Sequence, residues 1–192
     1  MLEEFIKKRP LIHTRNISLS AVPHTESQII VHGELKDERH VHIIDILGRD
    51  KPPGIVHHMT ATLLIAPDPL RIEQAEAKMI TVPVDQCPET LDRIELIQGL
   101  EVKPGFSQKV RNLVGGANGC AHLCTLVKAM GTEIIHGGLT WKRHQDRDKD
   151  RIPQIPKESP VYLVDSCRLW KKGGPRYNTL IQAIDHQAED NT

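Results

Sequence analysis

Alternation of apolar and polar residues between residues 28 and 82 limits the fold more than any other feature of the sequence. Residue-by-residue alternation places apolar side chains on one face of a β-strand, whereas a helix repeats about every 3.6 residues. The alternation is clear at residues 29–35, and residues 55–66 form a second run rich in Val, Thr, Leu and Ile. These runs predict a sheet with one buried face.

Turn residues divide this part of the chain into predicted strands. Residues 37–39 (Asp-Glu-Arg) suggest a polar turn before the apolar pattern resumes at residues 41–44. The Pro-Asp-Pro sequence at residues 67–69 then joins residues 55–66 to the run at residues 70–82. Connections this short join antiparallel neighbours. We therefore expect an antiparallel β-meander of about four strands.

The periodicity changes to a helical one after residue 84. Pro88 stands at an expected helix start, and apolar residues recur at helical spacing up to residue 100. Further helical turns are expected over residues 105–113 and after residue 120. Strands followed by helices predict an α+β fold, with the helices packed on one face of the sheet.

Three regions are expected along the chain. Residues 1–27 lack periodicity and predict an irregular N-terminal arm, and residues 28–141 form the expected α+β core domain. Residues 142–192 predict a charged connection and a C-terminal extension that packs on the core.

The charge balance bears on the partners. The chain has 25 Lys and Arg and 25 Asp and Glu, which argues against a nucleic-acid binder. No run approaches the roughly 20 apolar residues of a membrane span, and residues 1–10 lack the layout of a secretory signal. We therefore expect a cytoplasmic protein that contacts no membrane and acts on a small molecule. Exposed sheet edges are compatible with a homodimer.

Histidine and cysteine are the residues that could carry chemistry. The chain has 11 histidines and 4 cysteines. Histidine titrates near neutral pH and binds metals, and cytoplasmic cysteines serve as metal ligands or catalytic thiols more often than as disulfides. A metal or proton-transfer site is therefore expected. The pattern leaves open whether Cys124 and Cys167 belong to the core or to a site.

The strongest local candidate is the sequence GGANGCAHLC at residues 115–124. Gly116 and Gly119 allow the backbone to turn tightly, and amides at the start of the following helix can bind an anion or a substrate carboxylate. Cys120 at this helix start is expected to be a thiolate, which attacks electrophiles or binds metals, and His122 is a second ligand. The alternative is a glycine-rich helix cap around a small buried cysteine.

Two further segments offer partners for this run. His57 and His58 are adjacent in the predicted strand at residues 55–66, so only one of them can face the core. Cys87 precedes Pro88 at a second helix start and is a candidate ligand. Asp37 or His58 is the expected proton shuttle.

Five segments, taken in order, carry a family resemblance. They are the strand with His57 and Met59, the strand at residues 72–83 that leads into Cys87 and Pro88, LEVKPGF, GGANGCAHL, and VDSCRLW with Cys167. Over residues 28–172 the chain thereby resembles the bacterial family of unknown function DUF2889.

Two positions depart from the pattern of that family. His58 stands where the family commonly has Asp, and Ala121 stands where it has a hydroxyl residue. The resemblance implies that the His-x-Met pattern falls on His57. The order of strands, helices and cysteines is also similar to iron-sulfur scaffold proteins of the IscU and NifU type, by analogy alone.

Three functions are compatible with these residues. The first is a small metalloenzyme of hydrolase or lyase type, acting on a small organic acid or aromatic metabolite. Zinc or iron would be held by a subset of His57, Cys87, Cys120 and His122. The second is a cofactor-free enzyme with Cys120 as nucleophile and His57 or His122 as its base. The third is a binding protein without turnover, such as a metal or iron-sulfur scaffold.

Overall fold

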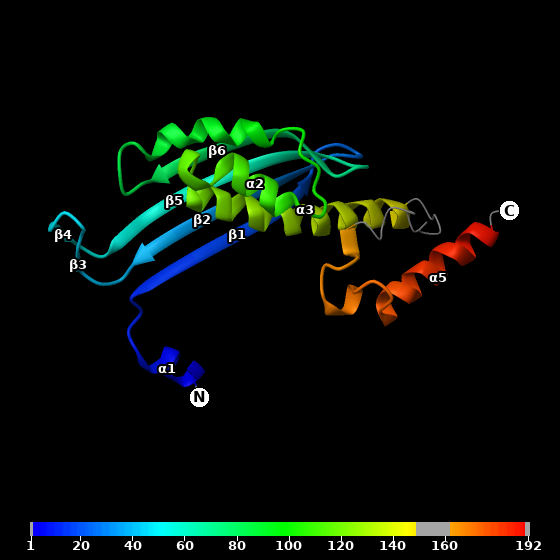
Figure 1. Ribbon diagram of the computed structural model, residues 1–192, viewed down its shortest axis with the longest axis horizontal. Helices are drawn as coiled ribbons and strands as arrows, with labels where there is room; N and C mark the ends of the chain where they lie inside the picture. The colour runs from blue at the N-terminus through cyan, green and yellow to red at the C-terminus, as the bar shows by residue number, and fades with distance from the viewer. Residues whose placement is uncertain (1, 149–161, 191–192) are drawn as a thin grey trace.

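The computed structural model describes residues 2–148 and 162–190. Its elements are α1 (Leu2–Lys8), β1 (His13–Pro23), β2 (Ile29–Arg39), β3 (Ile43–Ile44), β4 (Asp50–Lys51), β5 (Gly54–Ala66), β6 (Arg71–Thr81), the 3-10 helix η1 (Cys87–Ile97), α2 (Phe106–Val114), η2 (Gly116–Asn118), α3 (Ala121–Asp148), η3 (Arg168–Trp170) and α5 (Pro175–Asp190). Figure 1 shows the four-stranded sheet with η1, α2 and α3 on one side of it. The predicted α+β fold is confirmed.

The main sheet has the strand order β1-β2-β5-β6, and all neighbouring strands are antiparallel. The Pro-Asp-Pro turn joins β5 to β6, as the sequence predicts. In the register of the sheet, Asp37 on β2 lies between Arg15 on β1 and His57 on β5. These three residues therefore form a row across three strands.

The polar segment at residues 37–39 is not a turn, which corrects the sequence prediction. Strand β2 continues to Arg39, and its inward side chains include both Leu35 and Asp37. Residues 43–44 pair with β4 in a separate two-stranded sheet, outside the main sheet. The strand continues because Asp37 finds partners on the neighbouring strands, so a charged residue occupies an inward position.

The N-terminal region also differs from the predicted irregular arm. Residues 13–23 form the edge strand β1, which pairs with β2 along its full length. Leu19 and Ala21 on β1 pack against the core. Helix α1 has no buried residue. The fourth strand of the sheet is therefore β1, which replaces the segment at residues 41–44.

The core lies between the sheet and the helices. Inward residues of β2 and β5 such as Leu35, Met59 and Leu63 are fully buried, and they pack with Leu123, Leu126, Val127, Met130 and Ile134 of α3. Burial of this apolar surface is the main force that holds α3 on the sheet. The opposite face of the sheet carries many polar residues, such as Glu34, Lys36 and Thr62, as in a sheet with one solvated side.

Helix α3 runs past residue 141, the predicted end of the core domain. Gly131 and Gly137 lie inside this helix, each at a place where a side chain from outside the helix comes close. A Cβ atom at Gly131 would lie 2.8 Å from the Phe106 ring. The helix runs to Asp148, so the first part of the predicted charged connection is helical, and residues 149–161 lie outside the described residues.

The described part of the C-terminal region contacts the core through Tyr162, whose hydroxyl oxygen accepts a hydrogen bond from the Leu70 amide at 3.2 Å. Helix α5 packs against η3, where the Arg176 guanidinium lies 6.0 Å from the centre of the Trp170 ring. Apart from the N-terminal arm, the expected division of the chain stays a prediction.

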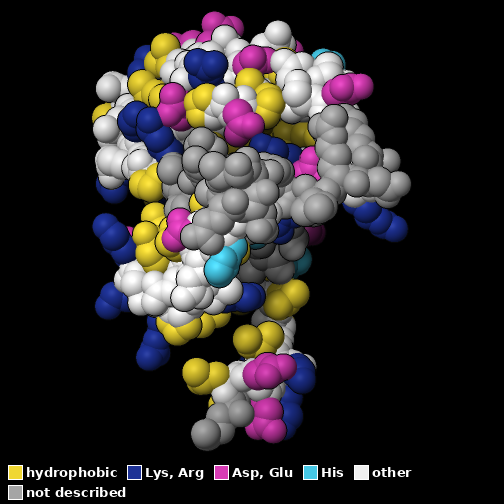
Figure 2. Space-filling model, turned by 90° about the vertical axis from the view of Figure 1, so that its right-hand side faces the viewer, with side chains coloured by type: hydrophobic (Ala, Val, Ile, Leu, Met, Phe, Trp, Pro, Cys, Tyr) yellow, Lys and Arg dark blue, Asp and Glu magenta, His cyan; other side chains and the backbone are white. Residues whose placement is uncertain are grey.

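The surface mixes charges of both signs. On the face shown in Figure 2, basic and acidic side chains are interspersed, with apolar side chains between them. In the described part of the chain, every helix is too short or too polar to cross a lipid bilayer.

Candidate metal centre

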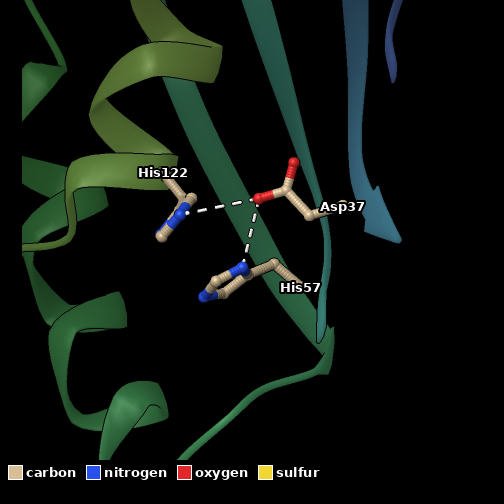
Figure 3. Close-up of side chains that lie close together, drawn as sticks. All are labelled: Asp37, His57 and His122. Atoms are coloured by element: carbon tan, nitrogen blue, oxygen red, sulfur yellow. Dashed lines mark hydrogen bonds and ion pairs between the residues drawn. The ribbon is translucent and has the colours of Figure 1, made fainter. Parts of the chain in front are cut away.

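Three side chains from three elements converge at one end of the sheet. Asp37 comes from the inner strand β2, His57 from the neighbouring inner strand β5 and His122 from the first turn of α3. Figure 3 shows both imidazole rings directed at the Asp37 carboxylate. Strand alternation turns Asp37 and His57 toward the helices, and the start of α3 places His122 above them.

Both imidazoles approach the same oxygen atom. His57 Nδ1 lies 3.1 Å from Asp37 Oδ2, and His122 Nε2 lies 3.6 Å from it. The two rings stack with their centroids 3.7 Å apart and their planes inclined by 27°. Each of the three residues offers one potential ligand atom, a carboxylate oxygen or a ring nitrogen, and these three atoms all lie within 4.8 Å of one another. This is a compact group of three potential metal ligands.

Arg15 holds the carboxylate from the other side. Its Nε donates to Asp37 Oδ1 and its Nη2 donates to Asp37 Oδ2, each at 2.7 Å. Paired hydrogen bonds of this kind between a guanidinium and a carboxylate are strong and directional. The Asp37 side chain is 1% exposed. Arg15 therefore fixes the orientation of a buried carboxylate.

The same contacts set the charge of Asp37. The hydrogen bonds from Arg15 lower the pKa of the Asp37 carboxyl, and this effect outweighs burial, which raises it. The positive charge of Arg15 and the two histidines lower the pKa further. Asp37 is thus ionised at neutral pH.

The histidines are shifted toward their neutral forms. Burial lowers the pKa of His57, although the neighbouring Asp37 partly offsets this. Burial also lowers the pKa of His122, and the charges of His57 and Arg15 act in the same direction. Neutral imidazoles keep a nitrogen lone pair, which is the form that binds a metal.

These distances fit a divalent metal after a small movement. Ligand atoms at about 2.1 Å from one ion stand about 3.0 to 3.4 Å apart in octahedral or tetrahedral geometry. The separation of 3.1 Å between Asp37 and His57 lies in this range, and that of 3.6 Å between Asp37 and His122 is slightly longer. All three ligand atoms lie within 4.8 Å of one another, so a shared ion would draw the imidazole nitrogens closer together.

His58, the other expected proton shuttle, lies on the opposite face of the sheet. Its Nε2 is 2.6 Å from Glu34 Oε1, away from Asp37 and His57. The reason is strand alternation, which turns adjacent residues of β5 to opposite sides. His57 shares the inward face with Met59, whereas His58 does not.

The cysteines do not join this group within the part of the chain that the structure describes. Cys120 precedes α3, and its sulfur accepts a hydrogen bond from the Leu123 amide at 3.5 Å, so it acts in capping the helix. Cys87 begins η1. Cys124 is buried in the core, where burial raises the pKa of its thiol, and Cys167 is exposed.

Gly116 and Gly119 have backbone reasons to be glycine. Gly116 has a positive φ of 67°, which L side chains rarely adopt. A Cβ atom at Gly119 would lie 2.0 Å from the Val114 carbonyl oxygen. The two glycines bend the chain between α2 and α3, and this bend positions His122.

Arg15 is the member of the site that sequence reasoning missed. It lies in the segment expected to be irregular, although Ile17, Leu19 and Ala21 alternate there with Ser18 and Ser20. Extending this alternation back by one step places Arg15 on the inward face. That short pattern was the available signal.

Comparison with protein families matches residues 13–136 to DUF2889, described as a protein of unknown function. A search of curated proteins and a search of solved structures each returned no match. The matched range begins at β1 and contains Arg15, Asp37, His57 and His122. Because the match covers more than half of the chain, the protein belongs to the DUF2889 family.

Proposed function

We propose that the protein is a metal-dependent enzyme of hydrolase or lyase type that acts on a small organic acid or aromatic metabolite. In this proposal Asp37, His57 and His122 hold one divalent ion. The observation that carries it is the approach of two imidazole nitrogens to one oxygen of a buried carboxylate. Cys87 and Cys120 are left out of the ligand set.

The ligand types favour zinc or iron(II). Two imidazoles and one carboxylate are a common set for both metals, whereas magnesium and calcium prefer oxygen ligands. Three protein ligands leave coordination positions open for water or substrate. A metal in such a site polarises a carbonyl group or lowers the pKa of bound water.

Arg15 is compatible with metal binding at Asp37. Each carboxylate oxygen has two lone pairs, so Oδ2 can accept from Arg15 and still face a metal. In the metal-free protein, the carboxylate can only accept, so His57 Nδ1 must carry the proton of their hydrogen bond. Metal binding through Nδ1 would require this proton to move to Nε2. Because a fully protonated imidazolium has no free lone pair, metal affinity should fall as pH is lowered.

Equilibrium dialysis against zinc, followed by elemental analysis, tests the ligand set. We expect one zinc ion per chain in the wild-type protein. The variants Asp37→Asn, His57→Asn and His122→Asn should each weaken binding at least about 10-fold, because each removes one of three ligands.

Two histidine variants serve as matched controls. His58→Asn changes the neighbouring residue on the opposite face of β5, and His136→Asn changes an exposed residue of α3. Both should bind zinc as the wild-type protein does. The metal centre is refuted if the wild-type protein binds no zinc, or if the His57 and His58 variants lose it equally. Circular dichroism of each variant separates loss of a ligand from loss of the fold.

The hydrogen bond between Asp37 and His57 supports a second candidate, a cofactor-free acid-base enzyme. Asp37 would orient the His57 ring, and Nε2 would act as the base. No contact in the described structure joins Cys120 to either imidazole, so this candidate does not require a cysteine nucleophile. Turnover that survives thorough chelation but is lost in His57→Asn would favour it.

A cytoplasmic location and a homodimer stay predictions.

A further inference from the structure

Arg15 retains hydrogen-bond donors beyond those it uses on Asp37. A guanidinium has five N–H groups, and the two bonds to Asp37 occupy one on Nε and one on Nη2. Within the described residues, Nη1 has no hydrogen-bond partner. Both of its N–H groups are therefore available to a ligand.

The exposure of the pair shows where this ligand would lie. The Arg15 side chain is 40% exposed, whereas the side chain of its partner Asp37 is 1% exposed. The guanidinium thus spans from the buried carboxylate to the solvent, on the same face of the sheet as His57. Arg15 is on β1, which pairs with β2 beside Asp37, so β1 forms one wall of the centre.

The charges of the centre are not balanced once a metal is bound. Within the described residues, Asp37 is the only carboxylate that pairs with Arg15, His57 or His122. Its charge cancels that of Arg15, and an imidazole that binds a metal does so in its neutral form, so both positive charges of a divalent ion stay uncompensated. A bound anion would supply the missing negative charge.

We propose that Nη1 of Arg15 binds an oxyanion group, a carboxylate or a phosphoryl group, of a small anionic substrate beside the metal. This inference rests on the proposed metal centre and names the substrate class for it. Arg15 then has two tasks, since one edge of its guanidinium positions Asp37 and the other edge binds the substrate. Guanidinium groups favour oxyanions because their donors match the spacing of the oxygens.

Calorimetric titration of the zinc-saturated protein tests the subsite. The probes are malonate and methylphosphonate, with neutral malonamide as the uncharged counterpart of malonate. We expect a dianion to bind and malonamide not to bind. The dianion that binds with the higher affinity identifies the preferred oxyanion as a carboxylate or a phosphoryl group. Arg15→Lys, titrated at saturating zinc, keeps the charge and loses the fork of donors, so the dianion should bind about 10-fold more weakly or worse.

Lys36→Gln is the matched control. It removes one positive charge next to Asp37 in the sequence but on the opposite face of the sheet, and dianion affinity should stay within about 2-fold of wild type. Zinc binding with no dianion binding, or with equal affinity in Arg15→Lys, overturns the subsite and leaves the metal centre standing. A wild-type protein that binds no zinc overturns both.

Discussion

At the scale of single residues, the site is built around the buried carboxylate of Asp37. A buried carboxylate is costly unless charged or hydrogen-bonding groups surround it, and Arg15, His57 and His122 do so. The arrangement keeps Asp37 ionised and both imidazoles neutral. These are the protonation states that a divalent metal needs.

The lowered histidine pKa values predict how stability depends on pH. Between the folded pKa values and the unfolded value of about 6.5, the unfolded chain binds more protons than the folded protein at His57 and His122. The free energy of unfolding of the metal-free protein should therefore be highest above this pH and fall as pH is lowered through it. Urea unfolding with chelator at pH 7.5 and pH 5.5 measures the change.

The variant His57→Asn/His122→Asn should reduce this pH dependence, because it removes the two groups that must be protonated against burial. His136→Asn should keep the wild-type dependence, since His136 is exposed. An unchanged dependence in the double variant would contradict the assignment.

Single residues of the site could be predicted from the sequence, but their grouping could not. Asp37, His57 and His122 were each candidates, and their contact depends on the register of β2 against β5 and on the placement of α3. The sequence favours cysteines as metal ligands because they lie at predicted helix starts, one of them near a histidine. Asp37 breaks the apolar alternation, and such breaks are expected where a residue serves a site.

At the scale of elements, α3 connects the site to the core. The helix starts at the residue before His122, and its glycines allow the far half to lie close to the sheet. A Cβ atom at Gly137 would lie 2.6 Å from the Ala21 methyl group of β1. Close packing along the helix therefore fixes the position of its first turn.

Gly137→Ala is expected to destabilise the protein. Alanine gains about 1 kcal/mol of helix propensity over glycine, but overpacking against Ala21 costs about 1 to 3 kcal/mol. We expect a net loss of about 1 kcal/mol in the free energy of unfolding, measured with urea. Thr140→Ala, at an exposed position of the same helix, should not destabilise it. A Gly137→Ala protein as stable as wild type would contradict the close packing.

The elements themselves were largely predictable. Alternation marked most of β2 and β5, the Pro-Asp-Pro turn marked the β5-β6 hairpin, and helical spacing marked the segments that cover the sheet. Two predictions, the turn at residues 37–39 and the irregular N-terminal arm, were wrong for the same reason. The local sequence pattern does not show which segments pair with each other in the fold. The charged segment at residues 37–39 continues a strand because Arg15 pairs with it, and β1 is ordered because β2 lies beside it.

At the scale of the whole molecule, the site lies where three strands and the start of α3 meet. Figure 1 shows α1 and the small β3-β4 sheet near the same end of the main sheet. Helix α1 has no buried residue, whereas β1 covers the edge of β2 and supplies Arg15. The N-terminal region therefore divides into a part that the fold does not need and a strand that it does.

Two truncations test this division. Removal of residues 1–10 should leave the free energy of unfolding within about 0.5 kcal/mol of wild type. Removal of residues 1–23 exposes the edge of β2 and leaves Asp37 without Arg15, so it should cost about 3 kcal/mol or more. Urea unfolding followed by circular dichroism measures both. Equal stability of the two truncated proteins would contradict the role of β1 in stabilising the fold.

The most direct test of the metal centre is a crystal structure of the zinc-soaked protein, with anomalous difference density measured at the zinc edge. The proposal predicts one peak between Asp37 Oδ2, a ring nitrogen of His57 and a ring nitrogen of His122, about 2.0 to 2.2 Å from each. Zinc bound at Cys87 or Cys120 instead, or no peak at these three residues with excess zinc present, would contradict it.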